Sequence, residues 1–408
     1  MKNKIIKSAL LIIIILYIQV VNIENAFAQA IPPQIHGEAV ILFDMEHGQI
    51  LYQKGSSLKL HISLSNKLMT ALLAIESIKP GQKIPASKEA INADGSMLNL
   101  EAGEKYLAQD LVTAIMLTSA NDAANVISEV IGGSTKEFVA LMNKKANALH
   151  MSDTVFKNPT GLYNSEQYTT AKDLYLLLKY ALKNPEFERL FTTKGLPFND
   201  LSLINSNKLI WRYEGAEGGK AGYNEIDKQS AATLVSRSNR TLISIVLFGE
   251  EDAVWSDSIS LLDFGFNNFM RGAIVQKGGK LRTAKAYDTT VNLISNEDVF
   301  YTYPYDESNI QKVEFATPDE LKPPITKNVP QGNLIYTLKD QTIITIPLFP
   351  DKEVIPAPTV ATRVKDLFKE SKDLMYLVAF LILIEIILII YKIVGAIRRS
   401  IRNRTRRT

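Results

Sequence analysis

Three short segments of the chain place serine, asparagine and lysine at spacings that could support nucleophilic catalysis. Residues 63–70 read Ser-Leu-Ser-Asn-Lys-Leu-Met-Thr, residues 119–121 read Ser-Ala-Asn, and residues 220–222 read Lys-Ala-Gly. A serine hydroxyl becomes a nucleophile when a neighbouring base takes its proton, and a lysine amine can be that base. The three segments together therefore form the candidate site.

The composition excludes several other kinds of site. The chain of 408 residues has no cysteine, and so no thiolate nucleophile, disulfide or Cys-ligated metal. Its four histidines show no metal-ligand spacing and no Gly-rich phosphate loop is present, so we expect neither a metal nor a cofactor. The net charge is +3, but without residues 1–28 and 374–408 the chain has 36 basic and 41 acidic residues, so we expect no nucleic-acid partner.

The two ends of the chain predict a membrane topology. Residues 1–28 have a basic start, an apolar run and Ala26-Phe-Ala28, which is typical of a cleaved signal peptide, with an uncleaved anchor as the alternative. Leu374–Val394 is long and apolar enough to span a bilayer, and residues 395–408 contain six arginines. Because basic residues stay in the cytoplasm, we predict a single-pass cell-membrane protein with a cytoplasmic tail. The alternative for the second segment is a helix lying on the membrane surface.

Periodicity divides the rest of the chain into a larger and a smaller domain. Mixed helical and strand-like patterns run over residues 29–275 and mark a first domain, short strand-like runs predict a small all-β domain over 276–349, and a linker follows over 350–373. Strands are predicted at 38–45, 49–53, 231–237 and 240–248, and helices from 66, over 109–117, after 121 and over 253–269. Ser134-x-x-Glu137 and Thr170-x-x-Asp173 are capping boxes that predict two further helix starts.

The sequence around the three segments resembles the D-alanyl-D-alanine carboxypeptidases, the low-molecular-mass penicillin-binding proteins, whose motifs are S-x-x-K, S-x-N and K-T-G. The stretches that carry the resemblance are Leu51-Tyr-Gln-Lys, Lys67-Leu-Met-Thr-Ala-Leu-Leu-Ala, Thr118-Ser-Ala-Asn-Asp-Ala-Ala, Phe156-Lys-Asn-Pro-Thr-Gly-Leu and Trp211-Arg-Tyr-Glu-Gly-Ala. The match is good over residues 36–272 and looser towards the C-terminus. It implies a penicillin-binding or β-lactamase-like domain, in which helices flank an antiparallel sheet.

The resemblance also implies roles for the matching residues. Lys67 would be the general base, and Ser119 and Asn121 would relay protons and hold the substrate peptide. Lys220 and Gly222 would belong to the substrate-binding segment, where the lysine supplies positive charge. The implied partner is a peptidoglycan stem peptide that ends in D-Ala-D-Ala, and the sequence indicates no particular protein partner.

Two positions depart from the family pattern. The nucleophile position, three residues before Lys67, is Leu64, and the threonine of K-T-G is replaced by Ala221. Since each helical residue turns by about 100°, Ser65 is predicted to point away from the lysine. Ser63 falls near the lysine's face but about 100° from the direction of Leu64, so it would reach a substrate only if the helix start shifted by one residue.

These departures leave three hypotheses open. The favoured one is a peptidoglycan-binding protein whose catalysis is impaired or lost, because losing a nucleophile can lower kcat by about 10⁶. The second is an active serine-type carboxypeptidase that is acylated through Ser63 and removes the terminal D-alanine. The third is a structural anchor in which the cleft is vestigial. The sequence does not decide whether the protein is an enzyme.

Overall fold

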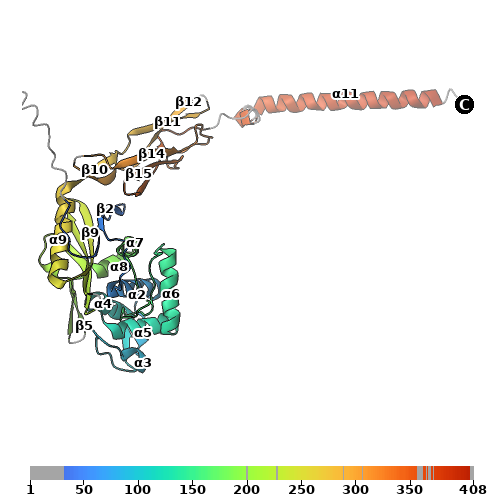
Figure 1. Ribbon diagram of the computed structural model, residues 1–408. Coiled ribbons are helices and arrows are strands. Elements are labelled where there is room, and N and C mark those ends of the chain that lie inside the picture. Colours follow the sequence, from blue (N-terminus) through green and yellow to red (C-terminus); the bar gives the residue numbers. More distant parts are fainter. Residues whose placement is uncertain are drawn as a thin grey trace, which may run out of the picture. The chain divides into compact units, whose positions relative to one another are not determined.

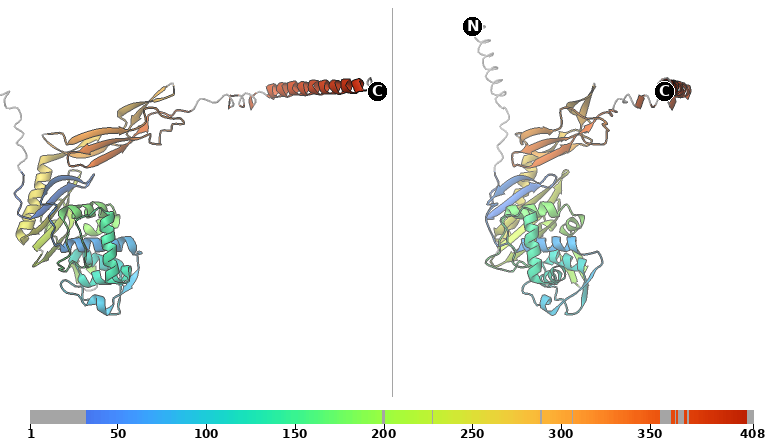
Figure 2. Two further views of the ribbon diagram at one scale, coloured as in Figure 1. Left: turned by 45° about the vertical axis from the view of Figure 1, so that its right-hand side comes forward. Right: turned by 90° about the vertical axis from the view of Figure 1, so that its right-hand side faces the viewer.

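The structure is a computed structural model that describes residues 32–198, 201–226, 228–287, 289–305, 307–355, 362–363, 365, 369–370 and 372–404. The predicted signal peptide lies outside the described residues, as do parts of the predicted linker and tail. Figures 1 and 2 show the described elements along the chain.

The helices of the first 280 residues are α2 (Ser63–Ser77), α3 (Lys88–Ile91), α4 (Ala108–Thr118), α5 (Asn121–Gly132), α6 (Thr135–Ala148), α7 (Ala171–Ala181), α8 (Pro185–Phe191), the 3₁₀ helix η1 (Lys208–Trp211) and α9 (Glu251–Asn268). The strands there are β1 (Ala39–Asp44), β2 (Gln49–Lys54), β3 (Lys83–Pro85), β4 (Lys105–Leu107), β5 (Gly195–Phe198), β6 (Leu201–Ile204), β7 (Ala216–Asn224), β8 (Lys228–Arg237), β9 (Arg240–Gly249) and β10 (Phe269–Val275). The Ser134 and Thr170 side chains cap α6 and α7 as predicted.

A five-stranded antiparallel sheet with the order β2-β1-β9-β8-β7 forms the centre of this region. Side chains alternate along β1 between two hydrophobic clusters, with Ile41 and Phe43 in one and Val40 and Leu42 in the other. Both faces of the sheet are therefore covered, as in an α+β layered domain. In Figure 1, α9 lies on one side of the sheet and α2, α4 and α7 lie on the other.

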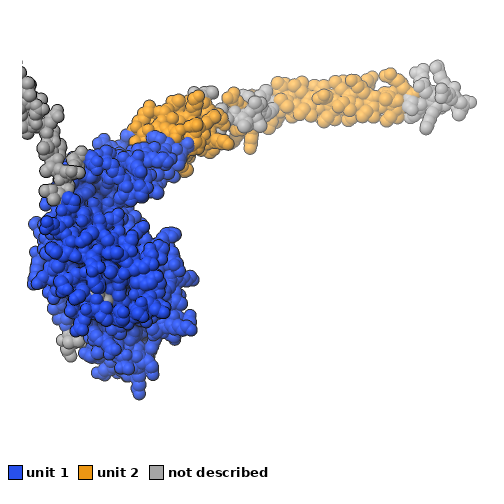
Figure 3. All heavy atoms as spheres, in the orientation of Figure 1, with its two compact units in different colours: residues 1–279, 295–317, 332–347 blue, residues 280–294, 318–331, 348–408 orange. Residues whose placement is uncertain are grey.

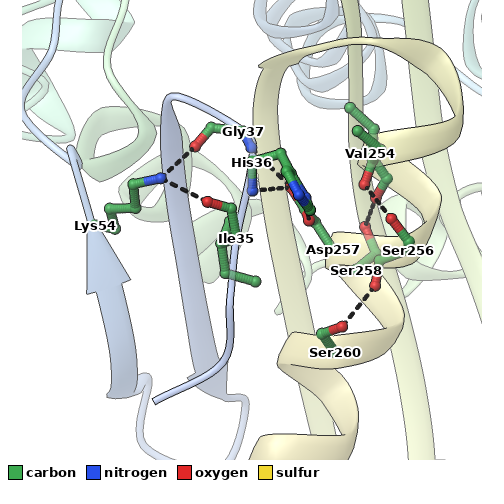
Figure 4. Close-up of polar contacts among 10 residues, drawn as sticks. Ile35, His36, Gly37, Lys54, Val254, Ser256, Asp257, Ser258 and Ser260 are labelled. Atoms are coloured by element: carbon green, nitrogen blue, oxygen red, sulfur yellow. Dashed lines mark hydrogen bonds and ion pairs between the residues drawn. The ribbon is translucent and has the colours of Figure 1, made fainter.

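The beginning of the first strand is fixed to α9 by a buried carboxylate. Asp257, which is 1% exposed, accepts hydrogen bonds from the backbone N–H groups of His36 (2.9 Å) and Gly37 (2.7 Å). The Nδ1 atom of His36 lies 3.0 Å from the same carboxylate. On the other side, the Lys54 ammonium donates to the carbonyl groups of Ile35 and Gly37 (Figure 4). These contacts fix residues 35–37, the segment that leads into β1.

The later part of the chain is built of short strands, which are β11 (Lys280–Ala286), β12 (Thr289–Ile294), β13 (Val299–Pro304), β14 (Ile310–Ala316), β15 (Asn333–Leu338), β16 (Ile343–Pro347) and β17 (Phe349–Pro350). They form a β10–β13 pair and two three-stranded sheets, β11-β12-β17 and β14-β15-β16. This confirms the predicted fold class, in which a small all-β region follows the α+β domain.

The chain forms two compact units, coloured separately in Figure 3. The first contains the described residues within 1–279, 295–317 and 332–347, and the second contains those within 280–294, 318–331 and 348–408. Strand β13 belongs to the first unit, where Thr302 donates to the buried carboxylate of Asp44 (2.7 Å). The domain boundary predicted at residue 275 stays a prediction.

The C-terminal helix α11 (Lys372–Arg404) contains the one stretch of the described residues that is long and apolar enough to cross a membrane, Met375–Arg399. Its 25 residues include the predicted segment Leu374–Val394 apart from the first residue. Length and composition alone make this helix a candidate anchor.

Candidate active site

The three motif segments meet around one cavity of about 400 Å³. Its walls come from the start of α2, the junction of α4 and α5, the loop before α7, and strand β7. The lining residues are Ser63, Leu64, Lys67, Gly95, Ser96, Thr118, Ser119, Asn121, Thr160, Gly161, Leu162, Ser206, Lys208, Ala221, Gly222, Tyr223, Asn224, Gln229, Glu251 and Trp255. Of the motif residues singled out from the sequence, all but Ser65 and Lys220 are among them.

Helix α2 presents Lys67 to this cavity. The Lys67 ammonium donates hydrogen bonds to the side-chain oxygen of Asn121 and to the backbone carbonyl of Thr160. Two neighbours on α2 hold the same loop, because Asn66 donates to the Asn158 carbonyl (2.7 Å) and Thr70 to the Pro159 carbonyl (2.8 Å). Lys67 therefore both faces the cavity and helps to fasten the loop over residues 158–161 to the helix.

Burial changes the protonation of Lys67. The side chain is 4% exposed, and removal from water lowers the pKa of its amine from 10.5 to about 7. The cause is the cost of keeping a charge in a medium less polar than water. Near neutral pH a substantial fraction of the amine is therefore unprotonated, as a general base requires.

The α4–α5 junction positions Ser119 and Asn121. Ser119 ends α4 in the left-handed conformation (φ 59°), and Asn121 begins α5. The Asn121 amide group donates to the Asp94 carbonyl, and its backbone N–H donates to the Ser96 carbonyl (2.7 Å). The asparagine thus connects Lys67 to the loop at residues 94–96, which forms another wall of the cavity.

Lys220 lies behind the cavity wall and is 0% exposed. Its ammonium donates to Ser119 Oγ (2.8 Å) and to the carbonyl groups of Ile115 (2.8 Å) and Met116 (3.0 Å) at the end of α4. Burial, with a smaller contribution from the charge of Lys67, lowers its pKa well below the ordinary value. Lys220 therefore contacts the cavity-lining residue Ser119 and does not itself line the cavity. Its role in substrate binding stays a prediction.

The nucleophile position is apolar in the structure. Leu64 lines the cavity but is 1% exposed and belongs to the hydrophobic core. Ser65 is buried, donates to the Ile62 carbonyl (2.8 Å) and is not among the cavity-lining residues. Ser63, the first residue of α2, is partly exposed and lines the cavity beside Leu64. It lies nearer to the site than the helical geometry predicted.

Strand β7 passes close to this helix start. A Cβ atom at Gly222 would lie 3.3 Å from Ser63 Oγ, which is tighter than an ordinary contact, so a glycine suits this position. The neighbouring Ala221 is 2% exposed and presents a methyl group where the family pattern has a hydroxyl.

Several cavity residues did not follow from sequence reasoning. Thr160 contributes a backbone carbonyl, which any residue type could supply. Ser206, Lys208 and Glu251 come from η1 and its approach and from the start of α9, which are distant in the sequence from the motifs. Only the sheet order, which places β7 next to β8 and β8 next to β9, brings these segments together.

Comparison with known proteins identifies this fold as that of a class of penicillin-binding proteins. Residues 25–251 match the family model "D-alanyl-D-alanine carboxypeptidase", and residues 268–355 match "Penicillin-binding protein 5, C-terminal domain". Because the first match covers more than half of the sequence, the chain belongs to the D-alanyl-D-alanine carboxypeptidase family.

Individual relatives agree with this assignment. The D-alanyl-D-alanine carboxypeptidase DacF of Bacillus subtilis (strain 168) is 28% identical over 326 residues, which cover 76% of this chain and 84% of the relative. The carboxypeptidase DacA of Haemophilus influenzae is 26% identical over 337 residues, covering 76% and 84%. The crystal structure of penicillin binding protein 5 from Haemophilus influenzae has a TM-score of 0.67 at 25% identity and covers 80% of this chain and 99% of its own.

Proposed function

We propose that this protein binds peptidoglycan stem peptides in the cavity and that its acyl-enzyme chemistry is impaired or lost. The family acts on such peptides, and Ser119 and Asn121 still line the cavity with hydroxyl and amide groups. The observation that carries the proposal is Leu64, a buried hydrocarbon side chain three residues before Lys67. Without a hydroxyl there, the amine of Lys67 has no proton to take from the expected nucleophile.

A specific observation favours a second candidate, an active serine-type D-Ala-D-Ala carboxypeptidase. Ser63 lines the cavity, is partly exposed, and lies four residues before Lys67, so its side chain is on nearly the same helix face. In this candidate Ser63 would be the nucleophile and Lys67 its base. A purely structural anchor is the remaining alternative, and it predicts no peptide binding at all.

One experiment separates the first two candidates. The full-length protein in detergent is incubated with benzylpenicillin, and its intact mass is measured. We expect the mass to stay unchanged and D-alanine release from a stem peptide to stay at background. A mass increase in the unaltered protein that disappears in Ser63→Ala would establish the active carboxypeptidase instead.

A second experiment tests binding. A fluorescent stem peptide that ends in D-Ala-D-Ala should show saturable anisotropy with the unaltered protein. The change Asn121→Ala removes an amide from the cavity and should weaken this binding. If the peptide does not bind, the structural anchor is favoured.

We further propose that α11 anchors the protein as a single span in the cell membrane, with the cavity-bearing domain outside and the tail in the cytoplasm. The supporting features are the apolar stretch Met375–Arg399 and the arginines that follow Val394. The proposed domain limits are residues 29–275 and 276–349, with a linker over 350–373.

A further inference from the structure

An ion pair lies at the wall of the cavity, between the Lys208 ammonium and the Glu251 carboxylate. Both side chains are about half exposed, at 43% and 52%, so they are accessible to a ligand. Trp255 also lines the cavity, one helical turn after Glu251. Residues four apart share a helix face, so the first turn of α9 directs this face towards the cavity.

The position of Lys208 is fixed from behind. The preceding residue, Asn207, is 0% exposed, and its amide group donates to the Ala232 carbonyl (3.1 Å) and to Thr233 Oγ1 (2.9 Å) on β8. Its side-chain oxygen accepts from the Leu209 N–H (3.0 Å) at the start of η1. These bonds hold the backbone of η1 against the sheet, and so they place the base of the Lys208 side chain.

Lys208 and the start of α9 together would attract an anion. Backbone N–H groups at a helix start carry partial positive charge, and an ammonium adds a full charge. In this protein the Glu251 carboxylate is itself the anion, because Glu251 lies in the first turn of α9 and pairs with Lys208. A carboxylate on a ligand would have to displace Glu251 or lie next to it.

The two buried lysines, Lys67 and Lys220, do not supply an attraction for the carboxylate of a ligand in place of Lys208. The ammonium of Lys67 donates to Asn121 and Thr160, and that of Lys220 donates to Ser119 and to two backbone carbonyls. Ala221 offers no hydroxyl. Taken together, the cavity has neutral polar groups, the internally balanced Lys208–Glu251 pair, and Lys67, whose hydrogen bonds are engaged within the protein. Lys220, behind the cavity wall, is engaged within the protein in the same way.

We propose that the Lys208–Glu251 pair makes this cavity prefer peptide segments without a free terminal carboxylate. The preferred ligand presents a neutral amide where a carboxypeptidase substrate presents its carboxylate. Such an amide is found both in a stem peptide with a carboxamide end and in a cross-linked stem peptide, whose chain continues through a peptide bond. This inference rests on the proposed function and specifies the ligand of the same cavity.

The test compares three ligands on the full-length protein in detergent. They are one stem peptide as its free acid, the same peptide as its C-terminal carboxamide, and a cross-linked dimer, each measured by competition against the fluorescent peptide. We expect the carboxamide to bind about fivefold more tightly than the acid, the size of effect given by one partly exposed charge interaction. Tight binding of the dimer as well as the carboxamide would indicate that both sources of the amide are accepted.

The variant Glu251→Gln should tighten binding of the acid by about fivefold and leave the carboxamide within about twofold, because only the acid meets the carboxylate. The matched control is Glu250→Gln, which removes the neighbouring charge at the same helix end. Glu250 pairs with Lys228 (3.2 Å) and is not among the cavity-lining residues. It should leave both affinities unchanged.

The outcomes distinguish failure of this inference from failure of the proposed function. If the acid binds at least as tightly as the carboxamide to the unaltered protein, this inference is wrong while the proposed function stands. If Glu251→Gln and Glu250→Gln have the same effect, the cavity carboxylate does not set the preference and the inference is also wrong. If none of the three ligands binds, the proposed function itself fails.

Discussion

Restoring a hydroxyl at residue 64 is the most direct test of whether its absence is what prevents acylation by penicillin. The double variant Leu64→Ser with Ala221→Thr returns the serine and threonine of the motifs to the cavity wall. We expect penicillin to label it, because Lys67 is buried with a pKa of about 7 and lies three residues after the new hydroxyl. Leu64→Ser alone should label more slowly, since Ala221 still lacks the hydroxyl that would hold the carboxylate.

The same change has a cost that the structure allows us to estimate. Leu64 is 1% exposed in the hydrophobic core, and shortening a buried leucine lowers the free energy of unfolding by about 2–5 kcal/mol. For a domain of this size, that corresponds to a fall in Tm of roughly 5–15 °C. Thermal unfolding must therefore be measured first, and labelling done well below the midpoint.

The matched control is Leu64→Ala with Ala221→Thr, which loses similar bulk but gains no hydroxyl at residue 64. We expect similar Tm values for the two double variants and an increase in intact mass for the serine variant only. A serine variant that is folded and remains unlabelled would refute this reasoning, because it would show that the rest of the site can no longer support acylation. Labelling of both variants would point to Ser63.

Three further predictions concern the protonation of Lys67, the hydrogen bonds of Asp257 and the orientation in the membrane. Labelling of the restored variant should accelerate as the pH rises through about 7, because deprotonation of Lys67 creates the base, and a rate that is flat between pH 6 and 8 would contradict this. Asp257→Ala should lower the free energy of unfolding by about 2–3 kcal/mol, since the N–H groups of His36 and Gly37 lose their buried acceptor, and a Tm shift below about 1 °C would count against it. Protease added to intact protoplasts should digest the domain at residues 36–272, and protection of this domain would reverse the proposed orientation.

Much of the fold follows from local sequence signals. The strands predicted at 38–45 and 49–53 correspond to β1 and β2, and the capping boxes mark the starts of α6 and α7. These signals are strong because periodicity and side-chain caps act over a few residues. The predicted helix start at 66 was late, because α2 begins at Ser63 without a capping side chain.

The candidate site was only partly predictable. Its motif residues were found because their types and spacing are unusual in combination. Strand β7, which carries Ala221 and Gly222, was not predicted, because its glycines and alanines lack the alternation of a typical strand. Lys208 and Glu251 give no local signal, since their pairing depends on how β8 and β9 order the segments around the cavity.

The position of β1 in the sheet has a consequence for how the chain acquires its structure during synthesis. β1 emerges early, yet one of its two neighbours is β9, which ends at Gly249. The central sheet therefore cannot close until nearly all of the α+β region has been made, and such long-range pairing forms slowly. A nascent chain of this kind therefore completes its central sheet later than one built of local hairpins.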